Sequence, residues 1–246
     1  FSQNVPYRLM GAYGSLDFVD RNIRVLSVQF SKVGKKTYDA FPNLEWIVAR
    51  SHGIDNVNLE ECEKRGIGIV NTNPYAESTA RWIQQYLTDE DTVGFVGYGA
   101  IAKNVKVSNK LVFNSKNTKE DLLKLAENSN TLIITVPQTK ETKHIINNKT
   151  IKHFPDGAVI SNSARGDMID DDAMVKALKN GKIFSLGLDV YNGEPNIHPE
   201  YLTLPNVFVL PHLGSATIKT RTAMGDLAVS NIEEFFKTGK CKNKVN

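Results

Sequence analysis

The chain has 246 residues, 41% of them hydrophobic and 23% charged, with a formal net charge of +3, which describes a globular protein of one large or two small domains. The charge is too small and too scattered for a nucleic-acid binder, and no apolar stretch approaches the roughly 20 residues that a membrane helix needs. No secretory signal is visible, and Cys62 and Cys241 have no motif spacing, so we expect reduced thiols in a cytoplasmic protein.

Strand-like runs alternate with helix-like runs along almost the whole chain. In chain order, the expected strands read IRVLSVQF, LEWIVAR, IGIV, TVGFVGYG, KLVFNS, TLIITV, GAVISNS, FSLGLDV and NVFVLP. Several of them are apolar on both alternations, which is typical of strands that are covered on both faces. The alternation therefore predicts a parallel sheet with helices on both sides.

Helices are expected between these strands. The stretches EDLLKLAENSN and DDDAMVKALKNGK both carry carboxylates at their starts, where the positive end of a helix favours them. The second stretch places Ala173, Ala177 and Leu178 on one face and stops at Gly181. A last helix is expected over residues 217–237, with an apolar stripe formed by Met224, Leu227, Ala228, Ile232 and Phe235.

A polar break, LTDED at residues 87–91, precedes the most apolar strand and indicates a domain boundary. We expect a substrate-binding lobe over residues 1–88 and a dinucleotide-binding domain over residues 89–214. Residues 215–246 are expected to form a C-terminal helix that returns to the first lobe. The predicted fold class is α/β: a doubly wound parallel sheet, Rossmann-like, in the nucleotide domain, and a second, smaller α/β lobe.

A glycine turn, TVGFVGYGAIAKNV, follows one predicted strand and opens a predicted helix. It reads Gly97-x-Gly99-x-x-Ala102, the dinucleotide fingerprint with alanine in its third place. Gly97 allows the tight turn, Gly99 lets the backbone approach a pyrophosphate, and Ala102 lets the helix pack closely. The helix start, at Ala100 and Ile101, is expected to hold the negative charge. In this setting a nucleotide site is favoured over a plain glycine turn.

The next strand lacks the carboxylate that normally binds the ribose hydroxyls of NAD. It ends instead in Asn114, Ser115 and Lys116. An acid there would repel a 2′-phosphate, whereas an amide, a hydroxyl and an ammonium group would accept one. We therefore expect NADP(H) to be preferred, with NAD(H) still usable. A plain polar strand end is the alternative interpretation, with about equal weight.

Several motifs, taken in order, resemble the D-isomer-specific 2-hydroxyacid dehydrogenases. They are RSHGIDNVNLEECEKRGIGIVNT, GYGAIA, VPQTKETKHIIN, NSARGDMIDDDAM, GLDVYNGEP and LPHLGSAT. The resemblance covers residues 42–82 and 120–236, and the chain is similar to a shortened glyoxylate/hydroxypyruvate reductase or phosphoglycerate dehydrogenase. It implies an oxidoreductase that transfers a hydride between a nicotinamide cofactor and a small 2-keto acid or D-2-hydroxy acid.

The resemblance also implies the roles of individual residues. His212 corresponds to the general acid/base, Glu194 to the carboxylate that keeps its proton available, and Arg165 to the fork that binds the substrate carboxylate. Asp189 corresponds to the acceptor for the nicotinamide amide. The remaining cofactor contacts implied are Pro137, Thr142, Ser163, Ala164 and Gly214. The backbone of Ser51, His52 and Gly53 is expected to bind the substrate carboxylate as well, and no metal is expected.

The chain departs from the family by deletions. Family members carry several dozen residues between the segment like PYAESTARW and the nucleotide strand, and these residues form the arm that builds the usual homodimer. Here the link is only IQQYLTDED, and the stretch after the nucleotide turn is also shortened. The deletions remove the arm of the usual homodimer, and they make one wall of the adenine pocket thinner.

Two function classes stay open at the level of the sequence. The first is a working NAD(P)-dependent reductase of small keto acids. The second is a nucleotide-sensing binding protein without significant turnover, similar to the family's transcriptional corepressors. A degenerate paralogue that folds without binding cofactor is a third alternative. Turnover with a panel of 2-keto acids separates the first two, and nicotinamide binding separates both from the third.

Overall fold

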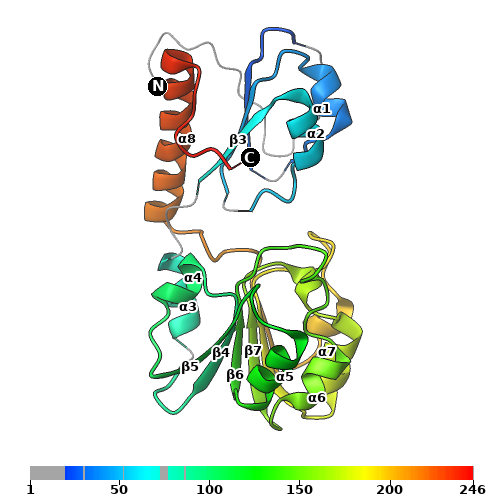
Figure 1. Ribbon diagram of the computed structural model, residues 1–246. Coiled ribbons are helices and arrows are strands. Elements are labelled where there is room, and N and C mark those ends of the chain that lie inside the picture. Colours follow the sequence, from blue (N-terminus) through cyan, green and yellow to red (C-terminus); the bar gives the residue numbers. More distant parts are fainter. Residues whose placement is uncertain (1–19, 30, 52, 73–76, 86, 246) are drawn as a thin grey trace. The chain divides into compact units, whose positions relative to one another are not determined.

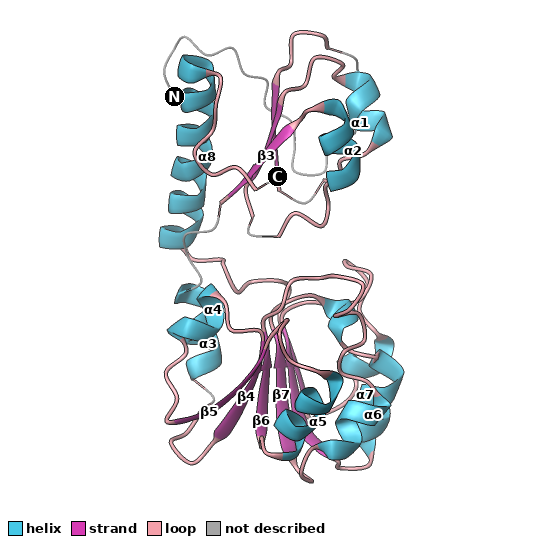
Figure 2. Cartoon of the chain, viewed as in Figure 1, coloured by secondary structure: helices cyan, strands magenta, loops and turns pink. Residues whose placement is uncertain are grey.

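A computed structural model describes the protein over residues 20–29, 31–51, 53–72, 77–85 and 87–245. The chain forms two compact units, each a parallel sheet with helices on both faces (Figures 1 and 2). Unit 1 comprises Phe1–Pro74 and Ile218–Asn246, and unit 2 comprises Tyr75–Thr217. The predicted fold class is confirmed: unit 2 has a doubly wound, Rossmann-like sheet, and unit 1 is a smaller α/β lobe.

Unit 1 contains a three-stranded sheet in the order β1-β2-β3, with β1 (Val25–Val28), β2 (Trp46–Ala49) and β3 (Gly68–Asn71) all parallel. Helices α1 (Lys35–Ala40) and α2 (Leu59–Arg65) pack on one face of this sheet (Figure 1). Their side chains and those of the strands close a continuous apolar core.

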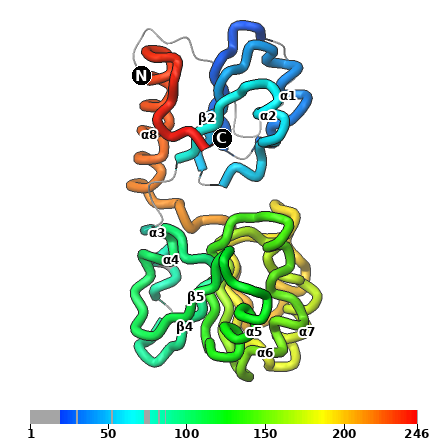
Figure 3. Tube along the Cα trace, in the orientation of Figure 1, coloured from blue at the N-terminus to red at the C-terminus, as the bar shows by residue number. Residues whose placement is uncertain are grey.

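The opposite face of the unit 1 sheet is covered by α8 (Ile218–Thr238), which confirms the predicted last helix. Ala228 and Ile232 of α8 pack against Val48 and Val70 of the sheet. Of the predicted stripe, Met224, Ala228 and Phe235 are buried, and Leu227 and Ile232 are half-buried. After α8 the chain turns back towards the sheet (Figure 3), where the Val245 N–H donates to the carbonyl of Ile69 at 2.8 Å.

Unit 2 contains a six-stranded parallel sheet in the order β5-β4-β6-β7-β8-β9. Its strands are β4 (Thr92–Val96), β5 (Asn109–Phe113), β6 (Thr131–Ile134), β7 (Ala158–Asn162), β8 (Ile183–Leu188) and β9 (Val207–Val209). The strand order reverses at β4, because β5 lies on one side of it and β6 on the other. In such sheets ligands bind beyond the carboxyl ends of the strands at the reversal.

Helices cover both faces of the unit 2 sheet (Figure 1). One face carries α5 (Lys119–Glu127), α6 (Asn148–His153) and α7 (Asp171–Lys179), and the other carries α3 (Glu77–Gln84) and α4 (Ala100–Asn104). The short 3₁₀ helices η1 (Gly166–Met168) and η2 (Pro199–Leu202) complete the unit. Because neighbouring side chains of β4 enter opposite clusters, its apolar run is continuous instead of alternating.

The two units divide after Pro74 and after Thr217, whereas the sequence predicted divisions after residues 88 and 214. Helix α3 accounts for the first difference, because its Ala80 and Ile83 pack with Val93 in the unit 2 core. Within the residues that the structure describes, no helix is long and apolar enough to cross a bilayer.

Candidate active site

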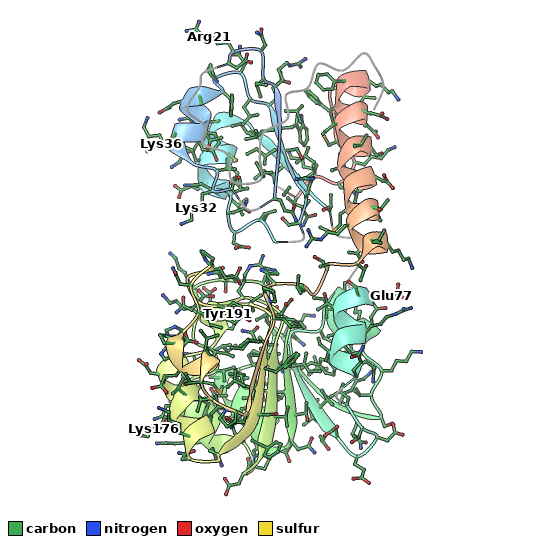
Figure 4. All side chains as sticks on the ribbon, turned by 180° about the vertical axis from the view of Figure 1, so that it is seen from behind. Arg21, Lys32, Lys36, Glu77, Lys176 and Tyr191 are labelled. Carbon is green, nitrogen blue, oxygen red and sulfur yellow. The ribbon has the colours of Figure 1, made fainter. Side chains whose placement is uncertain are left out.

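The three predicted catalytic residues all lie in unit 2, in loops beyond the carboxyl ends of adjacent strands. Arg165 follows β7, Glu194 follows β8, and His212 follows β9. Figure 4 labels Tyr191 among these loops. The parallel sheet therefore gathers segments from distant parts of the chain at one end of the unit.

His212 and Glu194 form a bonded pair. The ring atom Nδ1 of His212 lies 3.0 Å from Oε2 of Glu194, and the two side chains are 35% and 37% exposed. Because an ionised carboxylate only accepts hydrogen bonds, the ring donates its Nδ1–H to Glu194. This contact fixes the orientation of the imidazole, and it brings together two residues that the sequence predicted to act together.

The other oxygen of Glu194, Oε1, accepts the backbone N–H of Tyr191 at 2.9 Å. Burial raises the pKa of the Glu194 carboxyl. The hydrogen bonds from His212 and Tyr191, with the positive charge of Arg165, outweigh that effect, so the pKa lies below its ordinary value. Glu194 therefore stays ionised throughout the neutral pH range.

The backbone of His212 is held in an unusual conformation. Its φ of +56° lies in the left-handed region, which is uncommon for residues other than glycine. On one side the His212 N–H donates to the carbonyl of Leu210 at 3.0 Å. On the other side the carboxylate of Asp189 accepts the N–H groups of Leu213 and Gly214 at 2.6 and 2.7 Å. The surroundings thus fix a turn that the chain would not adopt by itself.

Asp189 is only 2% exposed. Burial raises the pKa of its carboxyl above the ordinary value, because the hydrogen bonds from Leu213 and Gly214 and the nearby His212 offset the loss of solvation only in part. The structure thus shows Asp189 organising the turn after His212. Its predicted contact with the nicotinamide amide stays a prediction.

Helix α3 contributes two residues to this turn that the sequence did not point to. The hydroxyl of Ser78 donates to the carbonyl of Gly214 at 2.8 Å. A Cβ atom added at Gly214 would lie 2.8 Å from Oδ2 of Asp189 and 2.9 Å from Oγ1 of Thr79. Any other residue there would push the Asp189 carboxylate or the Thr79 side chain out of place. In the sequence, the one feature that sets Ser78 and Thr79 apart is that two hydroxyl residues are adjacent in ESTARW.

The Arg165 segment is organised by a buried asparagine that was not among the predicted residues. Asn162 is fully buried; its Oδ1 accepts the N–H of Ala164 at 3.0 Å, and its Nδ2 donates to the carbonyl of Arg165 at 2.8 Å. A Cβ atom added at Gly166 would overlap the carbonyl carbon of Tyr191. The Arg165 segment therefore rests directly on the start of the Glu194 loop.

The glycine turn after β4 has the features that a dinucleotide needs. Gly97 has a φ of +92°, and a Cβ atom added to it would lie 2.8 Å from Cγ1 of Val136. At Gly99, by contrast, an added Cβ atom would meet nothing within 4 Å. Gly97 is thus packed tightly against Val136, whereas the space beside Gly99 is open. The open space leaves room for a phosphate to approach the Gly99 backbone.

The helix after this turn is short. Helix α4 ends at Asn104, and Val105 is extended with φ −82° and ψ +122°. Val105 instead buries its side chain in the cluster that contains Ala102. With only five residues, α4 adds little dipole to the turn, and the backbone N–H groups remain the main anion-binding feature.

The strand end predicted to hold a 2′-phosphate forms a closed turn. Oδ1 of Asn114 accepts the N–H of Lys116 at 3.0 Å, and the Asn114 N–H donates to Oδ1 of Asn117 at 2.8 Å. Asn114, Ser115 and Lys116 are all exposed. The Asn114 amide oxygen is used within the turn, but a phosphate accepts hydrogen bonds, so the amide NH2 group of Asn114, the Ser115 hydroxyl and the Lys116 ammonium group are the candidate donors to it.

The loops after β6 and β7 carry the other predicted cofactor contacts. Thr142 donates its hydroxyl to the carbonyl of Pro137 at 2.9 Å, which closes the loop after β6. Next to the buried Ala164, the Ser163 hydroxyl oxygen is inaccessible and has no hydrogen-bond partner among the residues that the structure describes. An unpaired buried hydroxyl costs free energy unless a ligand or water completes it. Together with the open turn at Gly99, it shows that this end of unit 2 fits a bound nicotinamide cofactor.

The predicted substrate residues belong to unit 1. The hydroxyl of Ser51 donates to the carbonyl of Gly53 at 2.7 Å, which closes a short turn after β2. His52 lies outside the described residues. Over the described part of the chain, no cluster of His, Cys, Asp and Glu side chains could hold a metal ion.

Comparisons with known proteins extend this description. The family model of the D-isomer specific 2-hydroxyacid dehydrogenase NAD binding domain matches residues 64–214. A glyoxylate reductase of Thermococcus onnurineus is 32% identical over 269 aligned positions, with 88% of this chain and 80% of the relative covered. A glyoxylate/hydroxypyruvate reductase of Arabidopsis thaliana is 31% identical, with 79% and 76% covered.

A solved structure agrees over most of the chain. The NADPH-dependent glyoxylate/hydroxypyruvate reductase of Sinorhizobium meliloti, in complex with NADP and malonate, has a TM-score of 0.81 at 30% identity. The likeness covers 92% of this chain and 84% of that one.

The alignments also bear on the predicted deletions. The alignment with the Thermococcus enzyme runs over 269 positions, although this chain has 246 residues and only 88% of them take part. The relative therefore carries internal residues that this chain lacks. The family match, the sheet order and the likeness to the solved enzyme confirm the family that the sequence predicted. The chain belongs to the D-isomer specific 2-hydroxyacid dehydrogenases, a family of NAD(P)-dependent oxidoreductases.

Proposed function

We propose that this protein reduces a small 2-keto acid to the corresponding 2-hydroxy acid, with His212 as the general acid and Glu194 as its partner. The observation that carries the proposal is the 3.0 Å bond between Nδ1 of His212 and Oε2 of Glu194, in a turn that Asp189 holds in place. The relatives are named for glyoxylate and hydroxypyruvate reduction, so these two acids are the first substrates to test.

Each proposed role follows from the chemistry of one side chain. A bound reduced nicotinamide supplies the hydride that reduces the substrate's carbonyl carbon. His212 gives the carbonyl oxygen a proton from Nε2, because Nδ1 is bonded to Glu194, and it takes the proton back in the reverse reaction. Arg165 binds the substrate carboxylate through its planar fork and polarises the carbonyl group.

The cofactor is proposed to lie at the carboxyl ends of the unit 2 strands. The residues proposed to contact it are Gly97, Gly99, Ala100, Ile101, Asn114, Ser115, Lys116, Pro137, Thr142, Ser163, Ala164, Asp189 and Gly214. The backbone of Ser51 and Gly53 is proposed as a further contact for the substrate carboxylate.

Turnover is the deciding test of this function. The purified protein is mixed with glyoxylate, hydroxypyruvate or pyruvate and with NADPH or NADH, and oxidation of the nicotinamide is followed by its absorbance. We expect turnover with at least one pair. Enhanced nicotinamide fluorescence without turnover on any acid would instead support the nucleotide-sensing alternative. The absence of both signals would support a protein that no longer binds cofactor.

The choice of cofactor is tested by Lys116→Ala. A charge-assisted hydrogen bond to a phosphate contributes roughly 1.5–3 kcal/mol, or about ten- to a hundredfold in affinity. We therefore expect the wild type to prefer NADPH over NADH by about that factor in kcat/KM, and Lys116→Ala to lose most of the preference.

Lys119→Ala, a nearby exposed lysine at the start of α5, is the matched control and should keep the wild-type ratio. A wild-type preference for NADH, or a ratio near one in both proteins, would remove the 2′-phosphate assignment from this turn.

Glu194→Gln is expected to change the pH dependence of reduction. The Glu194 carboxyl has a lowered pKa, so it is charged at neutral pH and favours the protonated His212 ring. Glutamine keeps the shape and loses the charge, so the alkaline limb of the kcat/KM profile for reduction should move to lower pH. Measuring kcat/KM between about pH 5 and pH 9 checks this.

The lowered pKa of the Glu194 carboxyl also affects the free energy of unfolding, and it does so at acid pH. A lowered pKa in the folded state stabilises the wild type above the ordinary carboxyl value of about 4.3, and this contribution is lost as the pH falls through the folded value. Thermal unfolding of Glu194→Gln should therefore depend less on pH in the acid range. If the activity profile keeps its wild-type position, Glu194 is a turn residue only.

A further inference from the structure

Tyr191 begins the loop that carries Glu194, and it was not among the predicted site residues. Its half-buried ring packs against the main core cluster of unit 2. Figure 4 labels it at the loop-bearing end of the unit. Three separate contacts connect this one residue to the segments of the proposed catalytic side chains.

The first contact is made by the Tyr191 backbone. Its N–H donates to Oε1 of Glu194 at 2.9 Å, while Oε2 of the same carboxylate bonds to the His212 ring at 3.0 Å. The carboxylate is thus held from both sides, and it cannot rotate without losing one of the two bonds. The position of Tyr191 therefore sets the direction from which Glu194 meets the imidazole.

The second contact is made by the hydroxyl of Tyr191. Its single proton is shared between the carbonyls of Leu188, at 3.2 Å, and Leu210. The Leu210 carbonyl also accepts the backbone N–H of His212. The hydroxyl therefore ties the end of β8 to the end of β9. It also steadies the acceptor on which the left-handed backbone of His212 depends.

The third contact involves the Arg165 segment. The peptide between Tyr191 and Asn192 lies against Gly166 so closely that any side chain on Gly166 would overlap it. Arg165 is the residue immediately before this contact. Moving the Tyr191 backbone would therefore displace the base of Arg165 as well as Glu194.

We propose that Tyr191 is the positioning residue that sets the mutual alignment of the three proposed catalytic side chains: Arg165, Glu194 and His212. The inference rests on the proposed function for the roles of those three, but the contacts that carry it are within the chain. Burial, followed by the charge of Asp189, raises the pKa of the Tyr191 phenol to about 12, so the hydroxyl remains a donor at any pH where the enzyme is assayed.

Tyr191→Phe tests this proposal because it removes the hydroxyl and keeps the ring. Losing the bond to Leu210 should lower kcat about three- to tenfold, while the KM values for cofactor and keto acid stay within about twofold. The looser His212–Glu194 pair should also move the alkaline limb of the reduction profile to lower pH, in the direction of Glu194→Gln. In a Glu194→Gln background, Tyr191→Phe should have little further effect, since both act through one pair.

Tyr201→Phe is the matched control. Tyr201 is 3% exposed, and its hydroxyl donates to Oδ1 of Asp171 at 2.9 Å, away from the His212 turn. Its loss should lower the thermal midpoint and leave kcat and the pH profile unchanged. A Tyr191→Phe variant that behaves like Tyr201→Phe, less stable but with wild-type kcat and profile, would overturn the proposal.

A second measurement separates this inference from the proposed function. The imidazole signals of the wild type and of Tyr191→Phe are compared by NMR, and the His212 signal is identified by its loss in His212→Asn. Tyr191→Phe should weaken the hydrogen-bonded Nδ1–H signal of His212, and an unchanged signal overturns the inference whether or not the protein turns over. Lack of wild-type turnover, or full activity of His212→Asn, overturns only the proposed function.

Discussion

His212→Asn is expected to abolish keto-acid reduction while cofactor affinity stays within a few-fold of the wild type. Asparagine cannot supply an ionisable proton, and the loss of a general acid costs roughly 100- to 10,000-fold in rate. Asparagine is also among the residues that best tolerate the left-handed backbone found at position 212, so the turn should survive the change. Steady-state kcat with the preferred keto acid measures the loss, and a nicotinamide fluorescence titration measures cofactor affinity.

His153→Asn provides the matched control. His153 is exposed at the end of α6, and its ring contacts only a carbonyl of its own helix in the described structure, that of Lys149 at 2.9 Å. This variant should keep wild-type rates. An undiminished turnover number in His212→Asn would remove His212 from the mechanism, and the proton would then have to come from another group.

Arg165→Lys is expected to lower kcat/KM by about a hundredfold, mainly through a higher KM for the keto acid, with a smaller fall in kcat. Lysine keeps the positive charge but replaces a planar fork with a point charge, so a carboxylate loses one of two charge-assisted bonds, worth roughly 1.5–3 kcal/mol. The variant also loses the 2.7 Å hydrogen bond from Nη1 of Arg165 to the carbonyl of Ala164, which holds the arginine side chain in place.

Initial rates over a wide range of keto-acid concentration separate KM from kcat in Arg165→Lys. Arg81→Lys on α3 is the control, because Arg81 is largely exposed and pairs with Glu77 on its own helix. It should leave both constants unchanged. Wild-type constants in Arg165→Lys would mean that the substrate carboxylate is bound by other groups.

The strands were predictable because of how they are buried. All nine expected strands occur in the structure, and the central strands β4 and β6 are apolar on both alternations because clusters lie on both faces of the sheet there. Helices α5, α7 and α8 were also predicted, since each has more than two turns and either carboxylates at its start or an apolar stripe. Helices α1, α2, α3 and α6 were not, because each has at most eight residues, too few for a periodic pattern to be distinguished from a loop or strand.

Local signals for one of these short helices were nevertheless present. The side chain of Asn58 caps α2 by accepting the N–H of Glu61 at 3.0 Å, and Gly66 ends it with a φ of +67°. Asparagine is a preferred N-cap residue and glycine a preferred C-terminal residue, so the spacing of Asn58 and Gly66 indicates a helix between them.

Some residues of the candidate site could be predicted from the sequence, and others could not. Side chains with chemistry of their own, such as Glu194 and His212, could be read from motifs and lie in contact in the structure. Residues that act by holding the backbone, such as Asn162 and Ser78, could not. Ser78 bonds to a residue 136 positions further along the chain, and nothing in the local sequence of either residue indicates that they meet.

The covering of the unit 1 sheet by α8 has a consequence for biosynthesis. Unit 1 is made first but is discontinuous, because the helix that packs on Val48 and Val70 is translated after the whole of unit 2. Unit 2 is contiguous and has all of its core as soon as it has been made, in keeping with domains that fold as units during synthesis. The first unit to leave the ribosome is therefore the last to be completed. Until α8 arrives it presents an apolar sheet face, the kind of surface that chaperones bind on nascent chains.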